Sequence, residues 1–492
     1  LKFGTLRLMF AQKLIGLDIG TTSVKAAVID TNGAIHARFS ESYPSSRTGT
    51  NLVEQNPDDW LGLLNRALNS FIDHEVVGIG ICSQVNTHVF LGVDERPLFP
   101  AITWQDIRAK NEAQDLNSQV SDEEKIKWWG SPMPIDASHA LSRMSWMKKM
   151  HGEIWNKTRK VMLPKDYCIL KLTGTASTDP LSNIGLVDNK FNYISELFDL
   201  VPDARQLMAP IIGVSDIAGY VSDGPFSGTP VISGTMDAWS GILGAGGAER
   251  NSSVYLSGTS EIMGISSAKI IPTPGAIVFP EVEEIRLHAA PTQHGGDAKL
   301  WFSSVFDLEM NQIAEMVSKK QRSNATPLFL PQLNGERSPH WDPTLRGAFL
   351  GVSRQTERVD FARAVYEGVA FAAKQAFEVT KKSSDVSSDL VYCGGGGFRS
   401  NEWNQIRSNV LGLPLKIIKS TEPGVMGAVT MAAKGVGIFP NLEKASKQLV
   451  QFDEQCDPDP RHTEQLLKIF EIYSDAISQT AEIGRRLNSL ET

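Results

Sequence analysis

Residues 14–30 read LIGLDIGTTSVKAAVID, an apolar run followed by an acid, a turn of glycine and threonine, and a second β-rich run. The pattern predicts two short strands joined by a tight turn. Gly20 lets the backbone turn sharply because it has no Cβ, and Thr21 and Thr22 offer hydroxyl and N–H groups to an anion. Asp18 stands where the turn begins. The stretch is therefore typical of a hairpin that cradles a phosphate group.

A related pattern recurs in residues 254–264, VYLSGTSEIMG, where an apolar run again meets glycine and hydroxyl residues before it resumes. One such turn alone is more often a plain β-hairpin than a ligand site. Two of them together predict two similar halves that face one nucleotide. The sequence has no GxxxxGK[ST] before a helix and no GxGxxG at its first strand–helix junction, which argues against a P-loop or a Rossmann origin.

Length and composition set the broad class. A chain of 492 residues exceeds what one hydrophobic core usually supports, so we expect two domains. No segment approaches the roughly 20 apolar residues that span a bilayer, which argues against a membrane protein. The net charge of −8 disfavours a broad nucleic-acid surface. Four cysteines without CxxC spacing argue against a zinc site or a disulfide-stapled secreted fold, and fit a reducing cytoplasm.

Glycine-rich and helical signals divide the chain. We expect residues 1–12 to be a leader or an added segment. The stretch PFSGTPVISGTMDAWSGILGAGG predicts a strand, a glycine turn and a helix, and its glycine-rich end at Gly247 is the best candidate linker. The sequence therefore predicts an N-terminal domain of residues 13–247 and a C-terminal domain of residues 248–492. A helix is expected to start after Asn56, where an acid pair precedes apolar residues at helical spacing.

Asp237 is the strongest single catalytic candidate. It follows a buried-strand pattern on a glycine-flanked turn, where a helix is expected to start. A helix N-terminus stabilises a carboxylate, so Asp237 would stay ionised and could accept a proton from a hydroxyl that attacks phosphorus. The alternative is that Asp237 only caps the helix, which is a common use of Asp.

A run of four glycines marks a second candidate ligand surface. Residues 394–397 follow an apolar strand pattern and precede a helix that contains Asn401. Glycines leave the backbone without side chains, so this surface could admit a flat adenine or ribose face, with Asn401 reading polar edges. The alternative is a flexible loop between strand and helix.

Together these stretches resemble the FGGY family of carbohydrate kinases over nearly the whole chain. LDIGTTSVKAAVID resembles the family's first phosphate hairpin, SGTMDAWSGILGAG its catalytic-base segment and YLSGTSEIMG its second hairpin. NGERSPHWDPTLRGAFLGV resembles its internal signature and GGGGFRSNEWNQIRSNVLGLPL its adenosine segment, while LPKDYCILKLTG is similar to pentulose kinases in particular. The resemblance implies an α/β fold of two actin-like (ribonuclease H-like) ATPase domains with a cleft between them. It also implies transfer of the γ-phosphoryl group of ATP to a sugar or polyol hydroxyl.

The resemblance also assigns roles to residues. Asp237 would be the catalytic base, and Asp18 would hold Mg²⁺ through water. Residues that would line the nucleotide and its phosphates are Gly20, Thr21, Thr22, Lys25, Gly258, Thr259, Gly296, Gly395, Gly396 and Asn401. Residues that would bind the sugar are Gln84, Val85, Asn86, Trp104, Asp106 and Asp237.

The substrate segment departs from the family's patterns. Xylulose kinases usually carry a GQMHG-like stretch and glycerol kinases an NQRE-like one, whereas residues 83–88 of this chain read SQVNTH. The leading expectation is a ketopentose such as D-xylulose, giving the 5-phosphate. Ribulose, erythritol and glycerol are alternatives, as is a non-catalytic actin-like protein that binds sugar or nucleotide. A homodimer stays open, because an isologous interface leaves no pattern in one sequence.

Overall fold

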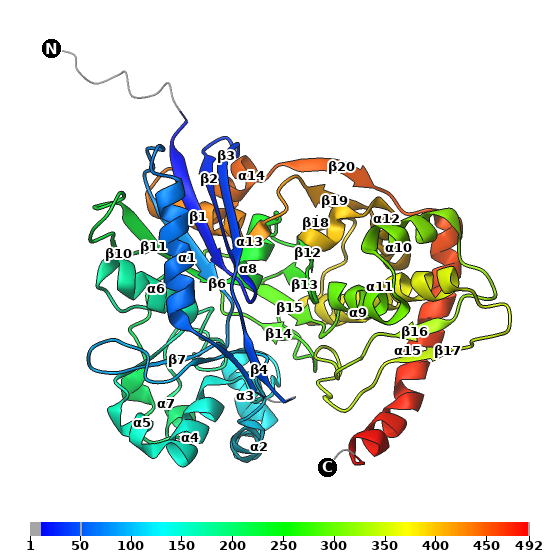
Figure 1. The fold of residues 1–492 in the computed structure, drawn as a ribbon, viewed down its shortest axis with the longest axis horizontal. Helices are drawn as coiled ribbons and strands as arrows, with labels where there is room; N and C mark the ends of the chain where they lie inside the picture. Colours follow the sequence, from blue (N-terminus) through cyan, green and yellow to red (C-terminus); the bar gives the residue numbers. More distant parts are fainter. Residues whose placement is uncertain (1–10, 50–51, 491–492) are drawn as a thin grey trace. The chain divides into compact units, whose positions relative to one another are not determined.

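Two mixed β-sheets organise the chain, each in its own unit (Figure 1). The computed structural model describes residues 11–49 and 52–490. The first unit consists of residues up to Ala248 together with Phe279–Glu284 and Glu422–Gln451. The second consists of Glu249–Val278, Ile285–Thr421 and the residues from Phe452 onward. Most of the expected leader, residues 1–10, lies outside the described residues.

The sheet of the first unit has six strands in the order β10-β11-β6-β1-β2-β3. Their bounds are β1 Lys13–Ile19, β2 Ser23–Asp30, β3 Ile35–Ser42, β6 Ile79–Ser83, β10 Ile217–Tyr220 and β11 Pro230–Met236. The predicted first hairpin is β1 and β2, which pair antiparallel, while β6 lies parallel to β1 and β11 parallel to β6. Three parallel strands therefore end at one edge of this sheet.

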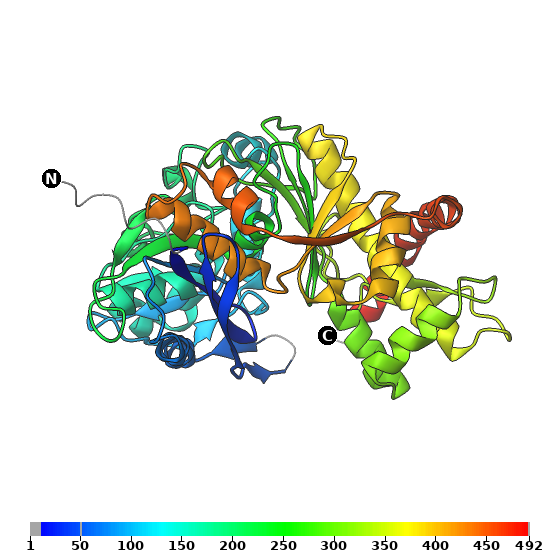
Figure 2. The same ribbon diagram turned by 90° about the horizontal axis from the view of Figure 1, so that it is seen from above.

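Helices cover both faces of this sheet. The helices are α1 (Pro57–Ser70), α6 (Pro164–Thr173), α8 (Asp237–Gly244), α13 (Pro423–Gly435) and α14 (Leu442–Leu449). Ile15 and Leu17 share a buried cluster with Trp60 of α1, whereas Gly16 between them faces α13. Side chains alternate along a strand, so α1 and α13 lie on opposite faces, as Figure 2 shows. Asn56 caps α1, as expected: its side chain accepts a hydrogen bond from the Asp58 N–H.

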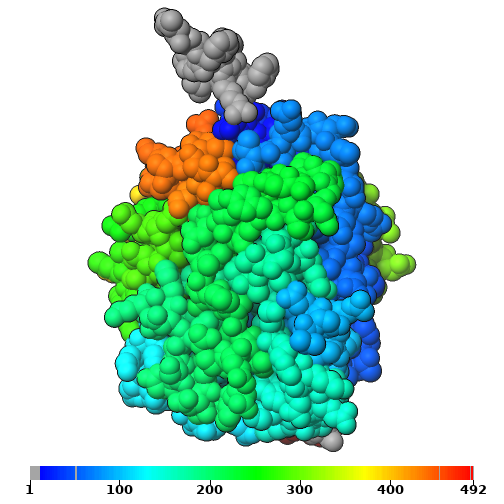
Figure 3. Space-filling model, turned by 90° about the vertical axis from the view of Figure 1, so that its left-hand side faces the viewer, coloured from blue at the N-terminus to red at the C-terminus, as the bar shows by residue number. Residues whose placement is uncertain are grey.

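Residues distant in sequence complete the first unit, which differs from the expected division at Gly247. The helix α13 packs so closely on the sheet that a Cβ added at Gly80 would lie 2.0 Å from the Ala428 carbonyl oxygen. It also packs on α8, where a Cβ at Gly427 would lie 1.9 Å from the Ser240 carbonyl oxygen. Figure 3 shows this late, orange part of the chain on the surface of the first unit, beside blue and green residues.

Short strands and helices between residues 46 and 207 build a smaller layer of the first unit. They are β4 (Ser46–Thr48), β5 (Leu52–Gln55), β7 (Val89–Leu91), β8 (Ala101–Ile102), α2 (Lys110–Ser118), α3 (Asp122–Trp129), α4 (Ala140–Met150), α5 (Gly152–Lys157), β9 (Lys160–Met162), α7 (Ser195–Phe198) and η1 (Arg205–Leu207). Their apolar side chains form a separate buried cluster around Trp128, Met144 and Met147. Within this layer, Arg143 of α4 contacts the backbone of the segments that carry Asn86 and Trp104.

The sheet of the second unit has seven strands in the order β14-β15-β13-β12-β18-β19-β20. Their bounds are β12 Ser253–Ser257, β13 Glu261–Ser266, β14 Ile277–Val278, β15 Leu287–Pro291, β18 Val391–Gly394, β19 Leu415–Ile418 and β20 Phe452–Cys456. Here too an antiparallel hairpin, β12 and β13, is followed by a strand, β18, parallel to its first strand. The run β3-β2-β1-β6-β11-β10 thus has the same directions as β15-β13-β12-β18-β19-β20, which agrees with the expectation of two similar halves.

The remaining elements of the second unit flank its sheet. They are α9 (Gly296–Phe306), α10 (Met310–Lys319), β16 (Leu328–Leu330), β17 (Ala348–Leu350), α11 (Arg358–Ser384), η2 (Gly396–Arg399), α12 (Asn401–Leu411) and α15 (Pro460–Asn488). The long helix α11 packs along β13 and β15, and its buried residues Val369, Phe371 and Phe377 contribute to two core clusters. No helix in the described part of the chain is both long and apolar enough to cross a membrane.

Candidate active site

The parallel strands of the first unit bring its predicted site residues to one edge. In the register of the sheet, Asp18 pairs with Cys82 and Ser83 pairs with Met236. The first phosphate turn, the SQVNTH segment and Asp237 therefore follow neighbouring strands at their carboxyl ends, where open α/β sheets bind ligands. Burial and then the negative charges of Asp18 and Asp237 raise the pKa of the Cys82 thiol, so both carboxylates lie near this strand end.

Asp237 is the first residue of α8. The residue at the N-cap position is Met236, and the Asp237 Oδ1 accepts a hydrogen bond of 2.7 Å from the N–H of Ala238. Asp237 is therefore one residue past the N-cap position, and its carboxylate still binds an N–H group of the first turn. Its carboxylate is half-buried at the positive end of the helix dipole, which favours the ionised form that a general base needs.

Asp18 has the features of a magnesium ligand. Its Oδ1 is buried and has no hydrogen-bond partner among the described residues. Desolvation raises the pKa of Asp18 to about 6, and the nearby Lys25 ammonium lowers it in part. No three His, Cys, Asp or Glu side chains cluster for a metal within residues 11–49 and 52–490. A single carboxylate fits Mg²⁺, which is usually held by one or two carboxylates together with waters and substrate phosphates.

Hydrogen bonds hold the turn between β1 and β2. The Gly20 N–H donates to the Ser23 carbonyl, while the Gly20 carbonyl accepts a hydrogen bond from the Tyr43 hydroxyl. The indole N–H of Trp104 donates to the Thr21 hydroxyl at 2.9 Å. Trp104, predicted as a sugar residue, thus touches the phosphate turn directly. Nearby, Thr22 is exposed and Lys25 pairs with Glu422 at 2.6 Å.

Two of the predicted sugar residues are already engaged within the protein. Gln84 is buried, and its Nε2 donates to the Gln55 Oε1 at 2.8 Å while its Oε1 accepts from the Thr87 hydroxyl. Asp106 is fully buried, and its carboxylate binds the Arg108 guanidinium and the Val53 N–H. Val85 and Asn86, in the same segment as Gln84, are only partly buried.

Asn86 belongs to a chain of polar contacts that the sequence did not indicate. Its Nδ2 donates to the Ser138 hydroxyl at 3.1 Å, and that hydroxyl donates to Asp136 at 2.7 Å. Asn86 itself adopts a left-handed backbone with φ of 52°. Glu422, next to the phosphate turn, was also missed, because it lies 397 positions after Lys25 and no local pattern connects them.

In the second unit, the predicted nucleotide residues meet at the matching sheet edge. The Gly258 carbonyl accepts a hydrogen bond of 2.9 Å from the Gly296 N–H, and the Thr259 carbonyl accepts one from the Asp297 N–H. A Cβ at Gly296 would lie 2.6 Å from the Gly258 oxygen, so this approach requires glycine. The second hairpin therefore packs directly on the N-terminus of α9, a position suited to an anion.

The four-glycine segment lies beside this hairpin. Gly395 has a φ of 100°, and a Cβ there would lie 2.4 Å from the Ser257 carbonyl oxygen. Gly396 faces open space and Asn401 is exposed at the start of α12. Arg407 fixes the segment by donating to the Gly397 carbonyl at 2.9 Å. This arginine is fully buried and forms an ion pair with Glu261 at 3.1 Å.

Known proteins match this chain in sequence. The FGGY family of carbohydrate kinases matches through its N-terminal domain at residues 13–244 and through its C-terminal domain at residues 282–436. The xylulose kinase of Lactococcus lactis subsp. lactis (strain IL1403) is 26% identical over 495 residues, which cover 96% of this chain and 98% of that protein.

Solved structures show the same fold. The ligand-bound xylulose kinase of Lactobacillus acidophilus superposes with a TM-score of 0.88 at 23% identity, covering 96% of this chain and 98% of the other. The gluconate kinase of Lactobacillus acidophilus gives a TM-score of 0.87 at 23% identity, covering 96% and 99%. With both family domains matched in order, the chain belongs to the FGGY family of carbohydrate kinases, which phosphorylate a sugar hydroxyl with ATP.

Proposed function

We propose that this protein phosphorylates a neutral ketopentose, with D-xylulose as the leading candidate and its 5-phosphate as product, in a reaction that needs ATP and Mg²⁺. The observation that carries the catalytic part is the position of Asp237, a partly buried carboxylate at the first residue of α8, near Asp18 and the SQVNTH segment. Named relatives among xylulose kinases support the choice of acceptor.

In the proposed reaction, Asp237 takes the proton of the acceptor hydroxyl while the hydroxyl oxygen forms a bond to the γ-phosphorus of ATP. The bond from that phosphorus to the bridging oxygen breaks, and ADP leaves. Bound Mg²⁺, held by Asp18 through water, would neutralise charge on the phosphates. The N–H groups of the Gly20–Thr22 turn would orient the transferred group.

A neutral acceptor is favoured over a sugar acid by the charges of the first unit. The cations Arg108, Lys165 and Lys25 are each paired with carboxylates, and Arg143 is bound to backbone carbonyls. A sugar carboxylate at this edge would have to compete with those partners. Asn86, by contrast, offers an uncharged amide that can both donate to and accept from sugar hydroxyls.

The test is ADP release, coupled to a dehydrogenase, with ATP and Mg²⁺ across D-xylulose, L-xylulose, both ribuloses, glycerol, erythritol and D-gluconate. Asp237→Asn serves as the blank. We expect one ketopentose to give the highest kcat/KM. A clear preference for D-gluconate would overturn the neutral acceptor, and sugar binding without turnover would favour a non-catalytic binding protein.

The compartment is a further part of the proposal. All four cysteines are free thiols, and three of them are buried. Unpaired cysteines are typical of a reducing environment, so we place the enzyme in the cytoplasm.

A further inference from the structure

A fully buried arginine joins the two segments that carry the candidate sugar residues. Arg143 lies on α4, and its guanidinium donates to the carbonyls of Asn86 and Thr103 and, at 2.9 Å, to the carbonyl of Ile102. It also donates to the Nδ1 of His88 at 3.0 Å. Asn86 and His88 belong to the SQVNTH segment, while Ile102 and Thr103 lead directly into Trp104.

The acceptors of Arg143 are unusual for a buried cation. They are backbone carbonyls and one imidazole rather than a carboxylate, and its Nε has no hydrogen-bond partner among the described residues. Burial lowers the pKa of Arg143 to about 9, although Asp106 and Asp136 raise it in part. A buried guanidinium without a carboxylate partner is costly to desolvate, so its net contribution to stability is small. Its position is better explained by what it holds in place.

The backbone that Arg143 binds is left-handed at Asn86. Asn86 has a φ of 52°, a conformation that residues with a Cβ rarely adopt, and its carbonyl is bound by Arg143 while its side chain is bound by Ser138. Arg143 of α4 and Ser138, just before α4, therefore fix the backbone and side chain of Asn86 within the segment from Ser83 to His88.

We propose that Arg143 is a positioning residue that fixes the acceptor-binding segments, and so sets the affinity for the sugar without touching it. The inference rests on the proposed function. A binding segment that is already fixed loses less conformational entropy when the sugar binds. Small displacements of a positioning group also have large effects on the reaction rate. Arg143 reaches the phosphate turn only indirectly, through the backbone before Trp104 and the hydrogen bond from the Trp104 indole to the Thr21 hydroxyl. ATP binding is therefore expected to change less than sugar binding.

The experiment compares Arg143→Met, Arg143→Lys and a matched control, Met147→Ala. Met147 is one turn further along α4, fully buried in the apolar cluster, and not part of the site. KM and kcat are measured for D-xylulose and for ATP, and hydrogen exchange is measured on the ligand-free proteins.

For Arg143→Met we expect KM for D-xylulose to rise about tenfold or more, with KM for ATP within about twofold. Arg143→Lys should recover part of this loss because it keeps a donor. Hydrogen exchange should rise in residues 83–88 and 102–106 of Arg143→Met. Met147→Ala should lower the thermal stability but leave both the KM for D-xylulose and the exchange of these segments as in the natural protein.

Two results would overturn the inference. One is equal loss for sugar and ATP in Arg143→Met. The other is unchanged exchange in both segments, a readout that needs no substrate. If the natural protein turns over no acceptor, the proposed function fails, and the exchange experiment still decides the role of Arg143.

Discussion

Asp237 combines a helix N-terminus with a position beside the phosphate turn, so its charge, rather than its shape, is expected to matter. Asp237→Asn keeps the shape but cannot accept a proton. We expect kcat to fall about 10²- to 10⁴-fold, the usual contribution of a general base, while ATP binding measured by calorimetry stays nearly unchanged. Residual turnover close to that of the natural protein would remove Asp237 from the role of base.

Asn86 can be tested apart from its backbone strain. Asn86→Ala removes the hydrogen bond to Ser138 and places at φ 52° a residue that tolerates the left-handed conformation less well than Asn, whereas Asn86→Gly removes the same bond but adopts that conformation without a steric cost. We expect both variants to raise KM for the sugar more than KM for ATP. Asn86→Ala should also be the less stable of the two by about 1 kcal/mol, measured by urea unfolding. An effect confined to ATP would place Asn86 outside the sugar pocket.

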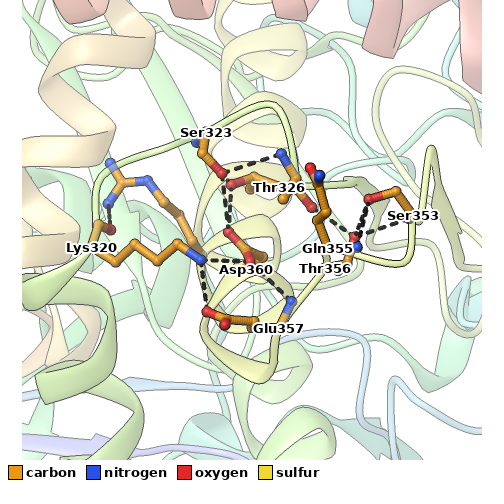
Figure 4. A network of polar contacts seen from close by, with 10 residues as sticks. Lys320, Ser323, Thr326, Ser353, Gln355, Thr356, Glu357 and Asp360 are labelled. Carbon is orange, nitrogen blue, oxygen red and sulfur yellow. Dashed lines mark hydrogen bonds and ion pairs between the residues drawn. The ribbon is translucent and has the colours of Figure 1, made fainter.

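The start of α11 shows how one carboxylate can fix a loop to a helix (Figure 4). Asp360 is buried, and its oxygens accept hydrogen bonds from Lys320 at 2.8 Å, from the Glu357 N–H at 3.0 Å and from the Thr326 hydroxyl at 3.0 Å. Burial would raise the pKa of Asp360, but these bonds outweigh it and lower the pKa below its ordinary value. The charged form is therefore the one that the fold stabilises.

The sign of the pH effect follows from that lowered pKa. The contribution of Asp360 is complete above the unfolded pKa of about 4 and is lost as pH falls through the lower folded pKa. We expect Asp360→Asn to reduce the free energy of unfolding by about 1–3 kcal/mol at pH 7, and the difference to shrink below pH 4. Urea unfolding at pH 7 and pH 3 measures it. Glu315→Gln, which removes an exposed pair with Lys319, should change little at either pH. A loss that stays constant with pH would contradict the electrostatic account.

How far the sequence predicts these elements depends on whether the signal is local. The turn around Gly20, the helix after Asn56 and the place of the four glycines between a strand and a helix were predictable, because each is set by neighbouring residue types. The ITWQDIRA pattern did not show that Arg108, two residues after Asp106, binds the Asp106 carboxylate, because a pattern of residue types does not show how side chains pair. Arg143 was missed because α4 also carries Lys148 and Lys149, and the helix sequence does not indicate which basic side chain is buried or which carbonyls it binds.

For the chain as a whole, the two sheets follow from the two hairpins, but the assignment of later segments to a unit does not. Residues 423–435, PGVMGAVTMAAKG, show an apolar helix without showing which sheet it covers. The answer lies in complementary small surfaces: Gly16 and Gly80 on the sheet and Gly427 on the helix permit backbone contact. These contacts join Gly16 to Val425, Gly80 to Ala428 and Gly427 to Ser240, and such shape matching between distant residues leaves no mark in a single sequence.

Because residues 422–451 belong to the first unit, the structure predicts how fragments of the chain behave. A fragment that ends at residue 248 lacks α13, whose Val425, Met426, Val429 and Met431 are buried. Burying each such side chain is worth about 1.5–3 kcal/mol, so losing four removes most of the roughly 5–15 kcal/mol that stabilises a typical domain. We expect this fragment to aggregate or to show no cooperative unfolding. The same fragment with residues 422–451 joined by a flexible linker should be monomeric and unfold cooperatively in urea. If the shorter fragment unfolds cooperatively with the same midpoint, α13 is dispensable to the first unit and the packing at Gly16 and Gly80 carries little stability.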